Sequence, residues 1–115
     1  MSFDKRRPPK RHQKFASDYP DLLDAYEVLG QRLTEAGPLN LREIRLCKLA
    51  MALGANLRGA TYAQTGLALE EGILPEEIRH VAIMALSTLG LPRMMSSLSW
   101  VDQVVESRAN ENAAE

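Results

Sequence analysis

An all-α fold is predicted for this 115-residue chain, in the form of a single-domain antiparallel bundle of about five helices. Aromatic residues make up only 5% of the sequence, so the core must come from aliphatic residues, Ala and Met. Leu, Ala and Met propagate helices well, whereas the β-branched residues that favour strands are few. Apolar residues recur at helical spacing, and short connectors separate the periodic segments, which places successive helices antiparallel.

The two ends of the chain differ in composition from its middle. Residues 1–14 hold six of the 14 basic residues against one acid, include adjacent prolines and lack apolar periodicity, so we expect a flexible basic arm. Residues 15–109 are expected to form the helical domain, and the Ala-, Asn- and Glu-rich residues 110–115 a frayed tail. The arm could contact nucleic acid, but a solvated leader, or an arm lying on an acidic subunit, is the favoured interpretation.

The first helix is expected to begin near Asp18, with Pro20 in its first turn, and to end at Gly37-Pro38. Its apolar residues recur at i, i+4, i+7 and i+11 and form a single stripe, made of Leu22, Tyr26, Leu29 and Leu33. A second helix is expected to start at Asn40, where Glu43 three residues later approximates a capping box.

Glycines and prolines punctuate the rest of the chain. The turn at residues 54–56 separates the second helix from a third over 57–71, in which Gly59 and Gly66 indicate close packing or a site. Gly72 is suited to end that helix, and Pro75, followed by two glutamates, to start the fourth. The fourth ends at residue 90 and a fifth begins at residue 92.

Membrane insertion and secretion are not expected. No apolar run approaches the ~20 residues that span a bilayer, and two prolines rather than an apolar stretch follow the basic N-terminus. A cytoplasmic location is therefore expected. The single cysteine, Cys47, cannot form an internal disulfide, and its apolar surroundings predict a buried, inert thiol. Nearby Arg45 and Lys48 leave a reactive thiol as the alternative.

Three elements in a fixed order carry a resemblance to a known family. They are residues 41–45 before an apolar helix ending at 52–55, residues 68–72 leading into 75–81, and residues 89–92 followed by 97–100. Over residues 40–105 this order resembles the carboxymuconolactone decarboxylase and alkylhydroperoxidase-D superfamily. The resemblance implies an all-helical bundle of the alkylhydroperoxidase-D-like type that assembles into homotrimers or homohexamers, with sites in clefts near subunit interfaces.

The resemblance also implies where reactive residues would lie. Peroxidase members look like thiol enzymes with a Cys-x-x-Cys pair at a helix start, a histidine four residues later and a glutamate on the preceding helix. The matching positions hold Leu57 and Ala60 for the cysteines, Gln64 for the histidine and Arg45, two residues from Glu43, for the glutamate. Without a thiol and a histidine the usual peroxidase chemistry is not expected, which indicates a degenerate active site.

Decarboxylase-like relatives resemble one another in keeping a histidine at the position of Gln64, and some add a second at that of Tyr62. A glutamine can orient a substrate but cannot exchange a proton near neutral pH. Tyr62 could donate a proton to an enolate, or Tyr62 and Gln64 could satisfy each other structurally. His80 follows Glu76 by four residues, but two groups on one helix do not make a metal site. No metal and no cofactor are expected.

Three functions remain open from the sequence. The first is binding of a small carboxylate in an interface cleft, for which we single out Arg45, Arg58, Tyr62 and Gln64. The second is a divergent decarboxylase or lactone isomerase in which Tyr62 or Glu43 is the catalytic proton-transfer group. The third is a non-catalytic assembly protein whose oligomer is held by Met94, Met95 and Trp100.

Overall fold

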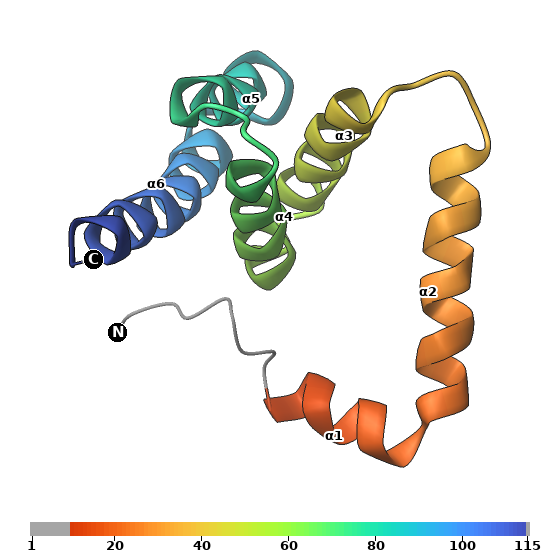
Figure 1. Cartoon of the computed structure of the whole chain (residues 1–115). Coiled ribbons are helices and arrows are strands. Elements are labelled where there is room, and N and C mark those ends of the chain that lie inside the picture. The colour runs from red at the N-terminus through yellow and green to blue at the C-terminus, as the bar shows by residue number, and fades with distance from the viewer. Residues whose placement is uncertain (1–9, 115) are drawn as a thin grey trace. The chain divides into compact units, whose positions relative to one another are not determined.

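A computed structural model describes residues 10–114 of the chain, with side chains from residue 12 to residue 113. This part of the chain contains six α-helices and no strand (Figure 1). They are α1 (Lys10–Asp18), α2 (Pro20–Glu35), α3 (Leu41–Gly54), α4 (Arg58–Glu70), α5 (Pro75–Leu89) and α6 (Leu91–Ala114). The all-α helical bundle is confirmed, with six helices where about five were predicted. One compact unit holds α1 and α2, and a second holds α3 to α6.

The unit of α1 and α2 differs most from the prediction. Residues 10–14, which the sequence assigned to a flexible arm, form the first half of α1, while residues 1–9 of that arm lie outside the described residues. Tyr19 separates the two helices with φ −137°, its ring lies 5.6 Å from that of Phe15, and Figure 1 shows a sharp bend there. Pro20 occupies the start of α2, as predicted, because its missing N–H needs no partner there.

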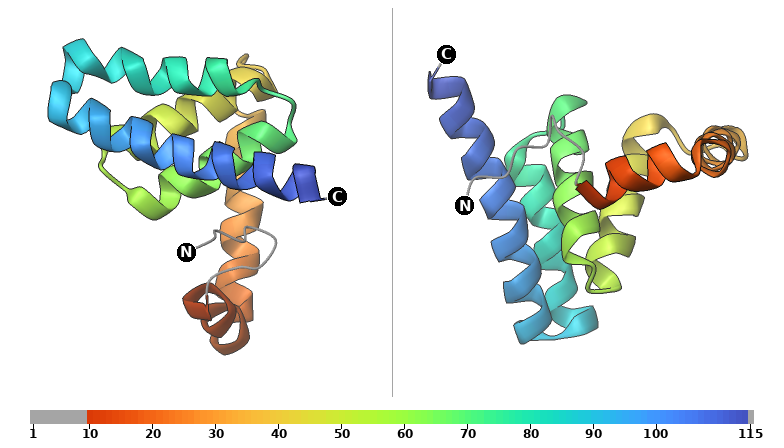
Figure 2. Two further views of the ribbon diagram at one scale, coloured as in Figure 1. Left: turned by 90° about the vertical axis from the view of Figure 1, so that its left-hand side faces the viewer. Right: turned by 90° about the horizontal axis from the view of Figure 1, so that it is seen from below.

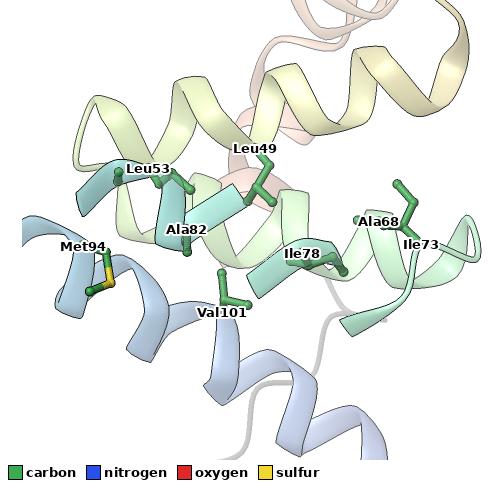
Figure 3. Close-up of a cluster of buried hydrophobic side chains, with 9 residues drawn as sticks. Leu49, Leu53, Ala68, Ile73, Ile78, Ala82, Met94 and Val101 are labelled. Carbon is green, nitrogen blue, oxygen red and sulfur yellow. The ribbon is translucent and has the colours of Figure 1, made fainter. Parts of the chain in front are cut away.

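The unit of α3 to α6 has its own buried core. Helices α5 and α6 lie side by side, and α4 packs against both (Figure 2). All four helices and the turn after α4 contribute to the buried cluster shown in Figure 3, formed by Leu49, Leu53, Ala68, Ile73, Ile78, Ala82, Ala85, Met94 and Val101. The small side chains of Ala68, Ala82 and Ala85 allow the helices to approach closely.

The predicted break at residues 54–56 is a helix C-cap. Asn56 has a positive φ of 60°, a conformation that Asn tolerates better than most residues. Its N–H donates to the carbonyl oxygen of Leu53 at 3.0 Å, and the N–H of Leu57 donates to that of Ala52 at 2.9 Å. This pair of bonds is the Schellman motif, which satisfies the last carbonyl groups of α3.

The same motif recurs at the end of α4, where the sequence predicted it. Gly72 has φ 85°, and its N–H donates to the carbonyl oxygen of Leu69 at 3.1 Å. The N–H of Ile73 donates to that of Ala68 at 3.0 Å, and the Ile73 side chain is buried. The cap therefore reverses the chain while placing an apolar residue in the core.

Helix α5 begins with the residues that the sequence indicated. Pro75 follows the N-cap residue Leu74, and Glu77 accepts a hydrogen bond from the N–H of Leu74 at 3.1 Å. Glu76 and Glu77 place negative charge in the first turn, where the helix dipole favours it. The helix ends at Gly90, whose φ of 96° and ψ of 163° lie in a region that is open essentially to glycine alone.

Two glycine-to-alanine substitutions are expected to change stability in opposite directions. Gly90→Ala should lower the free energy of unfolding by about 1–3 kcal/mol, because alanine is strained at that backbone conformation. Gly59→Ala should raise it by up to about 1 kcal/mol, because the residue is helical and an added Cβ meets no atom within 4 Å. Urea denaturation of both variants measures the difference. A loss of stability in Gly59→Ala would instead place a close neighbour at that glycine.

Ion pairs join the helices of the second unit at its surface. Arg42 pairs with Glu77 between α3 and α5, Arg79 with Asp102 between α5 and α6, and Arg108 with Glu70 between α6 and α4. Because most of these side chains are substantially exposed, each pair contributes about 0–1 kcal/mol. The buried apolar cluster is therefore the main source of stability for this unit.

Two further expectations need correction. The Cys47 side chain is exposed rather than buried, because the core-facing residues of α3, Leu49, Ala52 and Leu53, lie on another side of the helix. Residues 110–114, expected to fray, continue α6 to Ala114. No helix among the described residues is both long enough and apolar enough to cross a membrane.

Candidate functional site

Helix α4 carries Tyr62 and Gln64, the two residues at the positions where the family resemblance implies chemistry. Residues two apart on an α-helix point about 200° from each other around its axis. Accordingly, the Gln64 side chain bonds to a residue of α3, and that of Tyr62 to a residue of α6. The structure therefore places them in two polar groups on different sides of α4.

The first, the Arg45 group, consists of Arg45, Gln64 and Glu71. Arg45 donates from Nε and Nη2 to the two carboxylate oxygens of Glu71 at 2.9–3.2 Å, and from Nη1 to Oε1 of Gln64 at 2.5 Å. Only 16% of the Arg45 side chain is exposed. All three guanidinium nitrogens thus have hydrogen-bond partners in the same chain. This group joins α3 to α4 and to the residue that ends α4.

The second, the Tyr62 group, consists of Arg58, Tyr62, Ser99 and Gln103. Nε of Arg58 donates to the Tyr62 hydroxyl at 2.7 Å, and that hydroxyl donates to Oε1 of Gln103. Nε2 of Gln103 faces Oγ of Ser99 at 3.5 Å, and Cζ of Arg58 lies 5.4 Å from the centre of the Tyr62 ring. The group links α4 to α6, and Arg58 and Gln103 are exposed.

The two arginines differ in what they can still bind. Among the described residues, no hydrogen bond or ion pair occupies Nη1 or Nη2 of Arg58, whereas both Nη atoms of Arg45 have partners. The four members of the Tyr62 group, Arg58, Tyr62, Ser99 and Gln103, include no carboxylate. Arg58 can therefore present two parallel N–H donors to an anion without displacing a side chain.

The residues singled out from the sequence are thus brought together in pairs. Arg45 lies with Gln64, and Arg58 lies with Tyr62, while Glu43 is exposed in the first turn of α3. Leu57, at the position where the peroxidases carry a thiol, is the N-cap residue of α4. Across the described part of the chain, no cluster of three or more His, Cys, Asp or Glu residues could hold a metal ion.

Sequence reasoning missed Ser99 and Gln103. They lie four residues apart on α6, so they share one face of that helix. Their spacing alone does not distinguish them from any other polar pair on a solvated helix. Only the packing of α4 against α6 brings Gln103 to the hydroxyl of Tyr62.

The described part of the chain is all-helical. Its helix α4 bears polar side chains that bond to α3 on one side and to α6 on another. A sequence model of the carboxymuconolactone decarboxylase family matches residues 20–103, from the start of α2 into α6. The chain belongs to this family, which confirms the resemblance in the sequence. Comparisons with curated proteins and with solved structures gave no match.

Proposed function

We propose that this member of the carboxymuconolactone decarboxylase family binds a small carboxylate at the Tyr62 group, with Arg58 as the principal contact. The observation that carries the proposal is the contrast between the two arginines. Arg45 is held by Glu71 and Gln64, while Nη1 and Nη2 of Arg58 have no partner among the described residues. Of the two arginines, Arg58 is therefore the one whose Nη1 and Nη2 can donate to a ligand.

The neighbours of Arg58 fix its orientation. Tyr62 accepts from Nε and so leaves the other edge of the guanidinium, the two Nη atoms, to face a ligand. Two parallel N–H donors match the two oxygens of a carboxylate. Nε2 of Gln103 supplies a further donor beside them, because its hydrogen bond to Oγ of Ser99 is long, at 3.5 Å, and therefore weak. Gln64 and Arg45 serve in this proposal as supports of α4 rather than as direct ligand contacts.

The proposal includes a homo-oligomer, a trimer or a hexamer, in which a neighbouring subunit covers the site, and a cytoplasmic location. Arg58 is exposed in the single chain. An exposed arginine holds an anion weakly, because water competes for both charges. A second subunit that excluded water would strengthen the contact.

The second candidate function is a divergent decarboxylase or lactone isomerase. The observation in its favour is the position of the Tyr62 hydroxyl, which lies between a cation and an amide acceptor. A substrate carboxylate held by Arg58 would lie close to this hydroxyl, which could then donate a proton to an enolate carbon. Glu43, exposed on α3, remains the alternative proton-transfer group.

A thermal-shift screen against acetate, succinate, benzoate and muconate, with sodium chloride as the ionic control, tests carboxylate binding. We expect at least one carboxylate to raise the melting temperature of the wild-type protein, because a ligand that binds only the folded state stabilises it. No response to any of them would contradict the proposal and favour a non-catalytic assembly protein held by Met94, Met95 and Trp100.

Turnover of a muconolactone-type substrate distinguishes the enzyme from the binding protein. If Tyr62 donates the proton, Tyr62→Phe should remove turnover while leaving benzoate or muconate binding within about a factor of ten, since Arg58 is retained. Activity that survives the combined Tyr62→Phe and Glu43→Gln substitutions would show that neither residue is the catalytic proton-transfer group. Absence of turnover in the wild type, with binding present, supports the binding protein.

A further inference from the structure

The four members of the Tyr62 group form a chain of hydrogen bonds that runs in one direction. Nε of Arg58 donates to the Tyr62 hydroxyl at 2.7 Å, and that hydroxyl donates to Oε1 of Gln103. Nε2 of Gln103 then faces Oγ of Ser99 at 3.5 Å. Because a guanidinium group has donors and no acceptor, the first bond can only run from Arg58 to Tyr62. That bond therefore sets the direction of those that follow.

This direction fixes how the amide group of Gln103 is turned. The Tyr62 oxygen accepts from Arg58 and carries a single hydrogen, which it donates to Oε1 of Gln103. An amide turned by 180° would bring Nε2 to the same oxygen as a second donor, and would take the acceptor Oε1 away from the hydroxyl. Gln103 therefore turns Oε1 toward Tyr62 and Nε2 toward Ser99.

The atoms that remain for a ligand are hydrogen-bond donors. The oxygens of Tyr62 and Gln103 bond to each other. Nη1 and Nη2 of Arg58 have no partner among the described residues, and only one of the two hydrogens on Nε2 of Gln103 can point at Ser99. The Ser99 hydroxyl, which faces Nε2, can turn its own hydrogen toward a ligand. Arg58, Ser99 and Gln103 are all exposed, so a ligand can reach these donors.

Two carboxylates adjoin Gln103 on α6, and neither belongs to the group. Asp102 pairs with Arg79 of α5 at 2.6 Å. Glu106, about one turn further along the helix, forms no hydrogen bond or ion pair with the group within the described part of the chain. The donors of the group are therefore not neutralised by an acid of the same helix.

We infer that Gln103 determines the ligand specificity of the Tyr62 group, because its amide, held by the Tyr62 hydroxyl, presents a donor. The site then takes ionised carboxylates and rejects the corresponding neutral amides, whose own N–H groups find no acceptor there. The inference rests on the proposed function, in which Arg58 is the principal contact. It makes Gln103 a ligand contact and Tyr62 a positioning residue, whose hydroxyl hydrogen is committed to Gln103 rather than to proton transfer.

Isothermal titration calorimetry of the full chain with two pairs of ligands tests this specificity. The pairs are benzoate with benzamide and succinate with succinamide, which differ in charge and in the presence of N–H donors. We expect the wild type to bind at least one of the two carboxylates. The matching amide should bind about 10- to 150-fold more weakly, because it loses a charge-assisted hydrogen bond.

Gln103→Glu is the variant that separates the role of Gln103 from that of Arg58. Glutamate keeps an oxygen that accepts from Tyr62 but places a second carboxylate oxygen where Nε2 was. The site then loses a donor and gains an acceptor, so we expect the carboxylate to bind at least about ten-fold more weakly and its preference over the amide to fall. Asn110→Asp is the matched control. It adds the same charge at an exposed position of α6, about 10 Å further along the helix, and should keep the wild-type preference.

Tyr62→Phe tests the positioning role. Without the hydroxyl, the amide of Gln103 is free to turn Oε1 toward the ligand, where it accepts from a neutral amide. We expect the preference for carboxylate over amide to fall by about two- to ten-fold. A tyrosine that only packs against its neighbours would change both affinities alike and leave their ratio as in the wild type.

Each possible contradiction has a distinct meaning. Equal binding of carboxylate and amide by the wild type, or a wild-type preference retained in Gln103→Glu, overturns the role of Gln103 and leaves carboxylate binding at Arg58 in place. Equal losses in Gln103→Glu and Asn110→Asp assign the effect to general charge and overturn it too. An unchanged ratio in Tyr62→Phe overturns the positioning role. A wild type that binds neither benzoate nor succinate overturns the proposed function, and this inference with it.

Discussion

Leu49→Ala is expected to lower the free energy of unfolding by about 2–5 kcal/mol. Leu49 is fully buried and, with Leu53, is one of the two residues of α3 in the cluster that also contains Ile78 and Val101. Removing its branched end takes away apolar contacts and leaves a cavity between α3 and the other helices. For a domain whose total stability is about 5–15 kcal/mol, this is a large fraction.

Urea denaturation at one fixed protein concentration measures this effect, since assembly makes apparent stability depend on concentration. Leu49→Met is the matched control, because it nearly conserves volume and should cost less than about 1.5 kcal/mol. A loss below about 1 kcal/mol in Leu49→Ala would contradict the packing of α3 described here. That result would mean that Leu49 is not enclosed in the buried cluster.

Arg58→Ala is expected to weaken carboxylate binding by about 10- to 150-fold. The estimate follows from hydrogen bonds between charged groups, which contribute about 1.5–3 kcal/mol. Arg58→Lys should give an intermediate loss, because lysine keeps the charge but not the two parallel donors. Isothermal titration calorimetry with the carboxylate that gives the largest thermal shift measures all three affinities.

Arg42→Ala is the matched control for Arg58→Ala. Arg42 is likewise a partly exposed arginine, but it pairs with Glu77 between α3 and α5 and belongs to neither polar group. Both substitutions remove one positive charge, so a general electrostatic attraction would weaken equally in the two variants. Equal losses would therefore contradict a specific contact at Arg58.

Much of the helical pattern could be predicted because its boundaries depend on local chemistry. Gly72 and Gly90 take positive φ values that favour glycine, and Pro75 opens α5 where its missing N–H costs nothing. These effects depend on a few neighbouring residues and are visible in a single sequence. The same holds for Asn56, whose positive φ ends α3 at the predicted break.

Helix α1 was missed although one local signal was present. Lys14 and Asp18 are four residues apart and form an ion pair at 2.7 Å along the helix. The basic run and the adjacent prolines before it outweighed this signal in the prediction. The spacing of Tyr62 and Gln64 could also have predicted that their side chains lie on different sides of the helix, since residues two apart on a helix point in different directions.

Other features of the site require knowledge of tertiary packing. Gln103 reaches Tyr62 only because α6 lies against α4, and Glu71 reaches Arg45 only because α3 lies beside the end of α4. The exposure of Cys47 is of the same kind, since an apolar run does not reveal which side of the helix faces the core. Sequence patterns therefore identified the candidate residues but not their partners.

In the proposed function, the Tyr62 group binds the ligand while the Arg45 group joins helices. Its most direct test is an NMR titration with benzoate or muconate that follows the arginine Nε–H signals and the backbone amides of α4 and α6. We predict the largest shifts at Arg58, Tyr62 and Gln103, and small shifts at Arg45 and Gln64. Largest shifts at Arg45 and Gln64, with Arg58 unchanged, would show that the ligand binds at the Arg45 group instead.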